Sequence, residues 1–153
     1  MRNRNAYIRN ATKADLDLLF KWANDPIVRM NSFKTEPIPY ENHVSWFNRI
    51  IADPSVLQYV LMEDDTPVGQ IRLSIDGKEA EIGYSIANEF RGKGYGHIIL
   101  QLVADEVKNY HPEIDKLVAK VKPNNTASNK LFKSEGYEME YACYTKKLRS
   151  EME

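Results

Sequence analysis

The stretch Arg91-Gly92-Lys93-Gly94-Tyr95-Gly96 places three glycines within five residues. A strand-like run at 82–86 precedes it, and a helical pattern at 98–107 follows it. A strand that turns through glycines into a helix leaves several backbone N–H groups unpaired at the positive end of the helix dipole. Such a turn binds phosphate well, because glycine lets a ligand approach closely and tolerates a positive φ. The sequence therefore predicts a phosphate-binding turn, to which Arg91 and Lys93 add positive charge.

Two common phosphate-binding motifs do not fit this stretch. A dinucleotide fingerprint counted from Gly92 and Gly94 needs a third glycine where His97 stands. A P-loop needs Gly-Lys-Ser/Thr, whereas Gly94 is followed by Tyr95. The remaining pattern, Arg-x-x-Gly-x-Gly before an amphipathic helix, is also compatible with a tight turn carrying solvated basic residues. Further motifs are needed before a function can be assigned.

Composition limits the classes of partner and compartment. The 153 residues fit a single domain over 1–153, and the net charge of −1 gives no reason to expect a nucleic acid or a membrane as partner. The only cysteine, Cys143, cannot form an intrachain disulfide, which fits a reducing compartment. Residues 1–5 lack the apolar core of a signal peptide, and no apolar run is long enough to span a bilayer. We therefore expect a cytoplasmic protein, monomeric or homodimeric.

The pattern of the chain predicts the fold class. Strand patterns span 6–8, 56–62, 68–75, 79–87, 115–121 and, as a hairpin or pair of strands, 137–148. Helical patterns span 12–23, 40–52, 98–107 and 125–134. The segment 27–39 has no regular pattern, and a loop of this length often binds a ligand. Short turns predict an antiparallel meander, with a parallel neighbour only after the helix that follows Gly96. We expect an α/β (α+β) fold with a mixed, mostly antiparallel sheet of about 6–7 strands and about four flanking helices.

This order of elements, with the glycine-rich turn opening the third helix, resembles the GNAT superfamily of acetyl-CoA-dependent N-acetyltransferases. A second motif agrees with it: Pro123, Asn125, Ser128, Leu131-Phe132 and Gly136-Tyr137. It looks like the family segment in which an asparagine starts the fourth helix and a glycine–aromatic pair ends it. The resemblance covers about residues 5–148.

The resemblance implies a binding mode for acetyl-CoA as co-substrate. The backbone of 92–96 would hold the pyrophosphate, and the strand around Ser85 and Ile86 would pair with the pantetheine arm as an added strand does. A main-chain N–H there would polarise the acetyl carbonyl, and Asn125 would reach the cofactor from the other side. The expected cofactor-binding residues are Ser85, Ile86, Arg91, Gly92, Lys93, Gly94, Tyr95, Gly96, Asn125 and Ser128. We expect no metal.

A narrower likeness concerns the acceptor. Several short stretches are similar to acetyltransferases that act on nucleotide-linked amino sugars in bacterial pseudaminic-acid and related surface-glycan pathways. They are Trp22-Ala23-Asn24-Asp25-Pro26, Val28-Arg29, Asn31-Ser32-Phe33, Ile38, His43, Trp46-Phe47 and Gly69-Gln70-Ile71-Arg72. Substrate sites of the superfamily lie beside the first two helices. The expected acceptor-binding residues are Arg29, Asn31, His43 and Trp46. A nucleotide sugar needs a cation for its diphosphate, and Arg29 is the candidate.

The implied reaction is direct attack of an amine on the thioester in a ternary complex. Many relatives place a tyrosine as proton donor seven residues after the asparagine, where this chain has Phe132. Another group must then protonate the leaving thiolate, and the candidates are solvent and the tyrosines Tyr137, Tyr141 and Tyr144. Two residues are candidates for the base: Glu81, on the strand before the glycine turn, and His43, whose ordinary pKa suits the task.

Two classes of function remain open at this point. One is an enzyme that acetylates an amino sugar, another small amine or a protein N-terminus. The other is a non-catalytic domain that binds acyl-CoA. Phe132 favours the second class, whereas the acceptor-side residues Arg29, His43 and Trp46 favour the first. Cys143 lies in a strand pattern and is interpreted as a core residue rather than a nucleophile.

Overall fold

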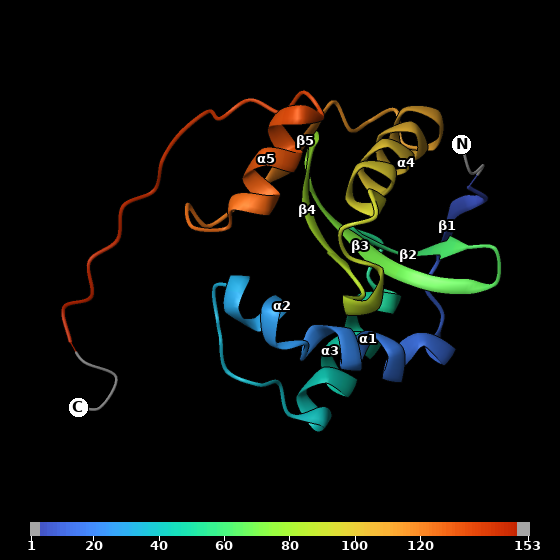
Figure 1. The fold of residues 1–153 in the computed structure, drawn as a ribbon, viewed down its shortest axis with the longest axis horizontal. Helices are drawn as coiled ribbons and strands as arrows, with labels where there is room; N and C mark the ends of the chain where they lie inside the picture. The colour runs from blue at the N-terminus through green and yellow to red at the C-terminus, as the bar shows by residue number, and fades with distance from the viewer. Residues whose placement is uncertain (1–3, 150–153) are drawn as a thin grey trace.

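The computed structural model describes residues 4–149 (Figure 1). Residues 1–3 of the polar N-terminal stretch and residues 150–153 lie outside the described part. The described residues form five strands, five α-helices and two short 3-10 helices. In chain order they are β1 (Ala6–Asn10), η1 (Lys13–Asp15), α1 (Leu16–Ala23), α2 (Pro26–Asn31), α3 (Tyr40–Ala52), β2 (Val56–Glu63), β3 (Thr66–Asp76), β4 (Glu79–Ile86), η2 (Asn88–Phe90), α4 (Tyr95–Tyr110), β5 (Lys116–Ala119) and α5 (Thr126–Ser134).

The five strands form one sheet in the order β1-β2-β3-β4-β5. The first three pairings are antiparallel, and β4 pairs with β5 in parallel across the α4 crossover, which confirms the expected meander and the position of the parallel neighbour. β4 pairs with β3 over a longer stretch than with β5. Its ladder with β3 extends from Glu79 to Ile86, whereas its ladder with β5 ends at Ile82. Among the described strands, none therefore lies beside residues 83–86 of β4 on the β5 side.

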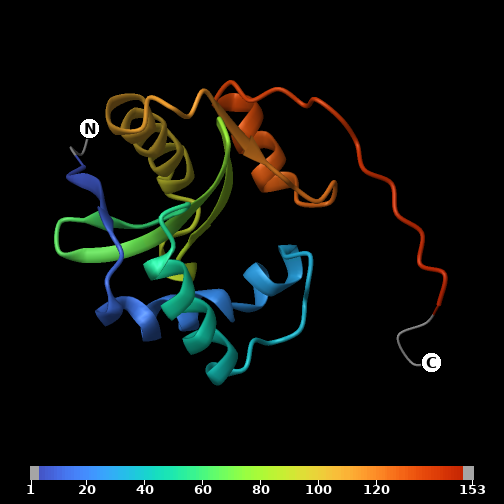
Figure 2. The same cartoon turned by 180° about the vertical axis from the view of Figure 1, so that it is seen from behind.

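Helices cover both faces of the sheet (Figures 1 and 2). The larger core lies between one face and α4 with α5, and it contains Ile71, Leu73, Ile99 and Phe132. A smaller core lies between the other face and α1 with α3. Period-two alternation along β3 decides which side chains enter each layer. Ile71 and Leu73 face α4, so Arg72 between them faces α3.

The segment predicted as an irregular loop begins with a helix. Asp25 caps α2 by accepting hydrogen bonds from the amides of Ile27 (2.9 Å) and Val28 (3.3 Å), and Pro26 occupies the first turn. The sequence pattern predicts a helix over 12–23 and no helix directly after it. Proline is also favoured at the first position of a helix, since its missing N–H has no partner to lose there. The Asp-Pro pair both ends α1 and starts α2.

The predicted C-terminal strands are wrong for this structure, and the described sheet has five strands instead of about 6–7. Residues 138–148 form no strand; they run away from the domain with most side chains exposed (Figure 1). A strand pattern is stabilised only where a neighbouring strand satisfies its backbone groups, and this segment forms no ladder with a described strand. Cys143 is exposed rather than a core residue.

Candidate functional site

A cavity of about 920 Å³ opens where the β5 ladder leaves β4. Five parts of the chain meet around it: α2, β4, the glycine turn with the start of α4, the end of β5, and α5. Arg72 of β3 also lines it. Most of the residues expected to bind a cofactor or an acceptor therefore lie around one cavity, although they are far apart in sequence.

The glycine turn has the geometry that a ligand loop needs. Gly92 and Gly94 have φ of 75° and 86°, which confirms the expectation of positive φ in this stretch. A Cβ added at Gly92 would meet no heavy atom within 4 Å, so the space over the turn is open. The first backbone bond of α4 joins the Ile98 N–H to the Gly94 carbonyl (3.3 Å), so the amides of the first turn lie outside the helix ladder. These features fit a phosphate group.

Gly96 has a different reason to be glycine. A Cβ built at Gly96 would lie 2.8 Å from Cδ2 of Leu131. The missing side chain therefore lets the first turn of α4 approach α5 closely. This close approach places the second motif of the chain beside the glycine turn.

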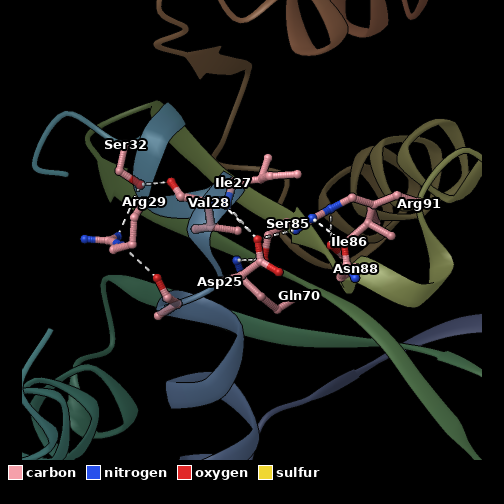
Figure 3. A network of polar contacts seen from close by, with 11 residues as sticks. Asp25, Ile27, Val28, Arg29, Ser32, Gln70, Ser85, Ile86, Asn88 and Arg91 are labelled. Carbon is pink, nitrogen blue, oxygen red and sulfur yellow. Dashed lines mark hydrogen bonds and ion pairs between the residues drawn. The ribbon is translucent and has the colours of Figure 1, made fainter. Parts of the chain in front are cut away.

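Arg91 joins the glycine turn to the acceptor side of the cavity (Figure 3). Its guanidinium forms an ion pair with Asp25 (3.1 Å), and its Nε donates to the Ile86 carbonyl (3.0 Å). Burial raises the pKa of Asp25, but hydrogen bonds from Arg91 and the α2 amides outweigh burial and leave that pKa below its ordinary value. Asp25 thus links the start of α2 to the turn after β4.

The other charged and aromatic residues of the turn are held by local contacts. Lys93 lies over the Phe90 ring, with Nζ 5.7 Å from its centroid. Tyr95 is buried, and its hydroxyl donates to Glu63 Oε1 (3.1 Å). Arg4 lies over the ring of Tyr95 and donates to the Lys93 carbonyl. Tyr95 therefore anchors the turn to the sheet, whereas the backbone of the turn faces the cavity.

Ser85 is positioned by a row of polar side chains across the sheet. Gln58 Nε2 donates to Gln70 Oε1 (2.9 Å), and Gln70 Nε2 donates to Ser85 Oγ (3.1 Å). Gln58 is buried, so this row is a fixed internal network. Ser85 and Ile86 belong to the part of β4 that β5 leaves unpaired, which is the place where the resemblance expects the pantetheine arm.

The α5 motif faces β4 across the cavity. Asn125 caps α5 by accepting from the Ser128 amide (3.2 Å), and Ser128 Oγ lies 2.8 Å from the Tyr84 hydroxyl. Burial raises the pKa of Tyr84, and the contact with Ser128 partly offsets that effect. Phe132 packs edge-on against Tyr84, with ring centroids 5.7 Å apart. A phenol therefore lies next to Phe132, contributed by β4 rather than by α5.

The three tyrosines named from the sequence are placed differently. Tyr137 packs against Phe132 with ring centroids 4.9 Å apart, and burial raises the pKa of Tyr137 to about 12. Tyr141 and Tyr144 are exposed on the C-terminal segment. None of the three lines the cavity within the described residues. Tyr84, which sequence reasoning did not consider, does line it.

Glu81 lies at the edge of the cavity on the acceptor side. Its Oε1 forms an ion pair with Lys120 Nζ (3.0 Å), and its side chain is about half exposed. It faces the same side of the sheet as Arg72. This position allows Glu81 to contact an amine in the cavity directly or through water.

His43 lies apart from the cavity. It is 2% exposed, its Nε2 lies 3.0 Å from the Leu16 carbonyl, and its ring packs among Phe20, Trp46 and Phe47. Burial lowers the pKa of His43, although the Leu16 carbonyl opposes that shift. His43 is not among the residues that line the cavity. The structure thus places it in the packing between α1 and α3.

Arg29 lines the cavity, but most of its donors bind the loop after α2. Its Nε donates to the Ala23 carbonyl (2.7 Å), Nη1 to the carbonyls of Lys34 (3.0 Å) and Glu36 (3.3 Å), and Nη2 to Ser32 Oγ (3.2 Å). The same loop encloses a separate hollow of about 350 Å³. Asn31 lines the larger cavity, and Trp46 reaches it only through its contact with Arg72.

Sequence reasoning thus missed specific roles for Tyr84, Asp25, Gln70 and Arg72. Three of them, Asp25, Gln70 and Arg72, were quoted in the acceptor-side likeness without a role. The alternation of β3 could have placed Gln70 and Arg72 on one face with Glu81 and Ser85 of β4, since strand residues two apart share a face. The contact of Tyr84 with Ser128 depends on tertiary packing and leaves no local signal.

Within residues 4–149, no group of three or more histidine, cysteine or acidic side chains could hold a metal ion. In the same part of the chain, no helix combines the length and the apolar character needed to cross a bilayer.

Comparison with known proteins identifies relatives. The family model described as an acetyltransferase (GNAT) domain matches residues 5–138. An uncharacterized protein of Methanocaldococcus jannaschii is 34% identical over 139 residues, which cover 85% of this chain and 27% of that protein. The chain thus spans about a quarter of the length of that relative. The acetyltransferase PseH of Campylobacter jejuni is 28% identical over 123 residues, covering 77% of this chain and 73% of that protein.

Among solved structures, the spermidine N-acetyltransferase of Vibrio cholerae in complex with CoA and spermine has a similar fold. Its TM-score is 0.80 at 20% identity, with 89% of this chain and 82% of that chain covered.

Proposed function

Because the chain belongs to the GNAT family of acetyl-CoA-dependent acetyltransferases, we propose that it transfers an acetyl group from acetyl-CoA to the primary amine of a small molecule, by direct attack in a ternary complex. One observation carries the proposal: the unpaired edge of β4 and the glycine turn open into the same cavity. The test is acetyl-CoA-dependent release of thiol with a panel of amines, together with calorimetry of CoA binding. A chain that neither binds CoA nor releases thiol with any amine would contradict the proposal.

The residues present fit acetyl-CoA. The amides at the start of α4 and the open space over Gly92 suit its pyrophosphate. The unpaired edge at 83–86 offers N–H and C=O groups to the amide-containing pantetheine arm. Bound there, the co-substrate supplies an activated thioester. Arg91, held by Asp25 and the Ile86 carbonyl, keeps the turn in place beside the end of β4.

For the acceptor, we propose a nucleotide-linked amino sugar. The likeness of residues 22–33 and 69–72 to acetyltransferases of that class supports the proposal. The charge of the cavity supports it as well, since five lysine or arginine residues and one acidic residue line it. A polyamine fits poorly into such surroundings, because like charges repel most strongly where water is scarce. The similar fold of the spermidine N-acetyltransferase therefore does not extend to its acceptor.

Proton transfer can be assigned to two residues of the cavity. Glu81 on the acceptor side takes a proton from the attacking amine, directly or through water. Tyr84, held against Ser128, gives a proton to the departing thiolate in place of the phenol that Phe132 lacks. Each residue reaches the cavity from β4, on opposite faces of the strand.

The role of Tyr84 leads to a mutational prediction. Tyr84→Phe keeps the edge-on packing with Phe132 but removes the hydroxyl. We expect kcat to fall about 10²-fold, the low end of the range for loss of a general acid, because water can replace the phenol in part. Affinity for CoA measured by calorimetry is expected to stay the same. Tyr141→Phe on the exposed segment serves as the control. An unchanged kcat in Tyr84→Phe would leave protonation to solvent.

Arg29 is expected to act through the loop that it holds. Arg29→Ala removes hydrogen bonds to three carbonyls, so the acceptor KM should rise while acetyl-CoA affinity stays constant. Arg29→Lys should not rescue the defect, because one ammonium cannot reach carbonyls on both sides of the loop as a planar guanidinium does. Steady-state kinetics with both variants measures this. Full rescue by lysine would mean that Arg29 acts by its charge alone.

The competing function is a non-catalytic domain that binds acyl-CoA. Phe132 at the usual tyrosine position is the observation that favours it. The two functions differ in one measurement. A binding domain shows CoA affinity in calorimetry but releases no thiol with any nucleotide-linked or free amine. The proposed enzyme binds CoA and also releases thiol.

A further inference from the structure

Arg72 lies at the centre of the acceptor side of the sheet. It stands on β3 opposite Gly83 of β4 and lines the cavity. Its guanidinium carbon lies 5.1 Å from the centroid of the Trp46 ring. A Cβ built at Gly83 would lie 3.3 Å from Arg72 Nη2, so the side chain extends across β4 in the space that this glycine leaves. Trp46 and Gly83 together fix where the guanidinium lies.

The charge of Arg72 has no close partner among residues 4–149. No hydrogen bond or ion pair joins it to another residue in that part of the chain. Burial lowers the pKa of Arg72, and the more distant charge of Glu81 opposes that shift. None of the Arg72 nitrogens is among the fully enclosed atoms without a partner, so its donors reach the open space of the cavity.

The other arginines and Lys120 at the cavity are already engaged. Arg91 binds Asp25, Lys120 binds Glu81, and Arg29 binds loop carbonyls. Arg72 is partly buried and keeps its donors for the cavity, so a ligand that accepts hydrogen bonds from them would offset the cost of its desolvation. The groups that match its planar fork are oxyanions, which accept two parallel hydrogen bonds. The contact with Trp46 adds to its preorganisation, since it holds the cation in one orientation before the ligand arrives.

We propose that Arg72 is the binding site for an oxyanion, phosphate or carboxylate, carried by the acceptor. This inference rests on the proposed acetyl transfer and specifies its substrate: the acceptor is an amine that also bears a negative group. The anion contacts Arg72 over the start of the open β4 edge, and the amine lies beside it within reach of Glu81. The same cation disfavours polyamines, which carry positive charge along their whole length.

The test compares acceptors that differ only in the anion. The acceptors are a free amino sugar, its 1-phosphate, its nucleoside-diphosphate conjugate and the corresponding amino sugar acid. The wild type is expected to have a lower KM for the anionic acceptors than for the free amino sugar. Comparing the phosphorylated acceptors with the amino sugar acid shows whether phosphate or carboxylate binds better. In Arg72→Met, which keeps the length of the stem against Trp46, the KM for the preferred anionic acceptor is expected to rise roughly tenfold or more. The KM for the neutral sugar and the affinity for CoA are expected to stay constant.

Two further variants make the result specific. Arg72→Lys keeps the charge but loses the fork, so it should recover only part of the preference for anions. Arg49→Met removes an exposed cation from α3, the helix that carries Trp46, and should behave as wild type. Equal KM values for neutral and anionic acceptors in the wild type would overturn the inference. A loss in Arg72→Met that is the same for all acceptors would also overturn it, because that pattern indicates a packing role.

A binding measurement keeps the inference testable if no amine is acetylated. Inorganic pyrophosphate is titrated into the wild type and Arg72→Met by calorimetry, with CoA at saturation so that the glycine turn is occupied. Weaker binding in the variant supports the oxyanion site even when the proposed acetyl transfer fails. The same pyrophosphate affinity in both proteins rejects the site, whether or not the chain is an enzyme.

Discussion

Glu81→Gln is expected to lower kcat by about 10²–10⁴-fold, the range for loss of a general base, while acetyl-CoA and the acceptor still bind. Glutamine keeps the shape of the side chain but cannot accept a proton from an ammonium. The ion pair with Lys120 at 3.0 Å holds the carboxylate at the edge of the cavity, about half exposed, where an amine and water both have access. Steady-state kinetics with saturating co-substrates measures the effect.

The pH dependence of kcat in Glu81→Gln distinguishes the loss of a general base from a disturbed structure. In Glu81→Gln the rate should recover partly as pH rises, because more of the amine is then neutral without help from the protein. Glu79→Gln is the matched control: Glu79 lies on the same strand and faces a lysine of β5 at 3.7 Å, but it does not line the cavity. That variant should keep its kcat at every pH.

His43 provides the competing prediction. If His43 were the base, Glu81→Gln would be nearly silent and His43→Ala would carry the pH-dependent loss. The surroundings of His43 favour a different outcome, since its Nε2 is bound to Leu16 and three aromatic rings surround it. His43→Ala is therefore expected to lower the melting temperature, because it leaves a cavity between α1 and α3, and to change kcat little at temperatures where it stays folded. If neither variant loses rate, catalysis relies on positioning and solvent.

The parts of the fold that sequence reasoning predicted correctly are those with strong local signals. Gly92 and Gly94, which adopt positive φ, mark the turn before α4, and period-two alternation of side chains marks the strands of the meander. The family resemblance, carried by two motifs in the expected order, implied that both bind one cofactor, and both line one cavity. These features follow from backbone sterics and hydrogen bonding, which a short stretch of sequence already determines.

The parts that could not be predicted depend on neighbours distant in the chain. Whether residues 138–148 form strands depends on a sheet edge to pair with, and no residue within the segment encodes that. The role of Arg29 depended on where the carbonyls of Lys34 and Glu36 lie, so its assignment as a free cation had no support from local pattern. The solitary charge of Arg72 becomes visible only when Trp46, Gly83 and Glu81 are placed around it.

Gly94→Val is expected to weaken acetyl-CoA binding by about 1–3 kcal/mol, roughly 5- to 150-fold in Kd. Two effects add. At φ of 86° a β-branched residue is strained, so the turn shifts away from the geometry that presents the first amides of α4. In addition, the new side chain enters the space over the turn, where the nearest protein atom to an added Cβ is Nη1 of Arg4 at 3.6 Å and where the pyrophosphate is expected to lie. Calorimetry with CoA measures the change.

The chain offers a matched control for backbone strain. Gly77, in the turn between β3 and β4, also has a positive φ, of 63°, and an added Cβ there meets no atom within 4 Å. Gly77→Val should therefore lower thermal stability by a similar strain but leave CoA affinity unchanged, because that turn is not among the residues that line the cavity. Equal CoA affinity in wild type and Gly94→Val would show that the glycine turn does not bind the pyrophosphate. Weaker binding in both variants alike would assign the loss to general destabilisation, whereas a loss confined to Gly94→Val locates the phosphate at the start of α4.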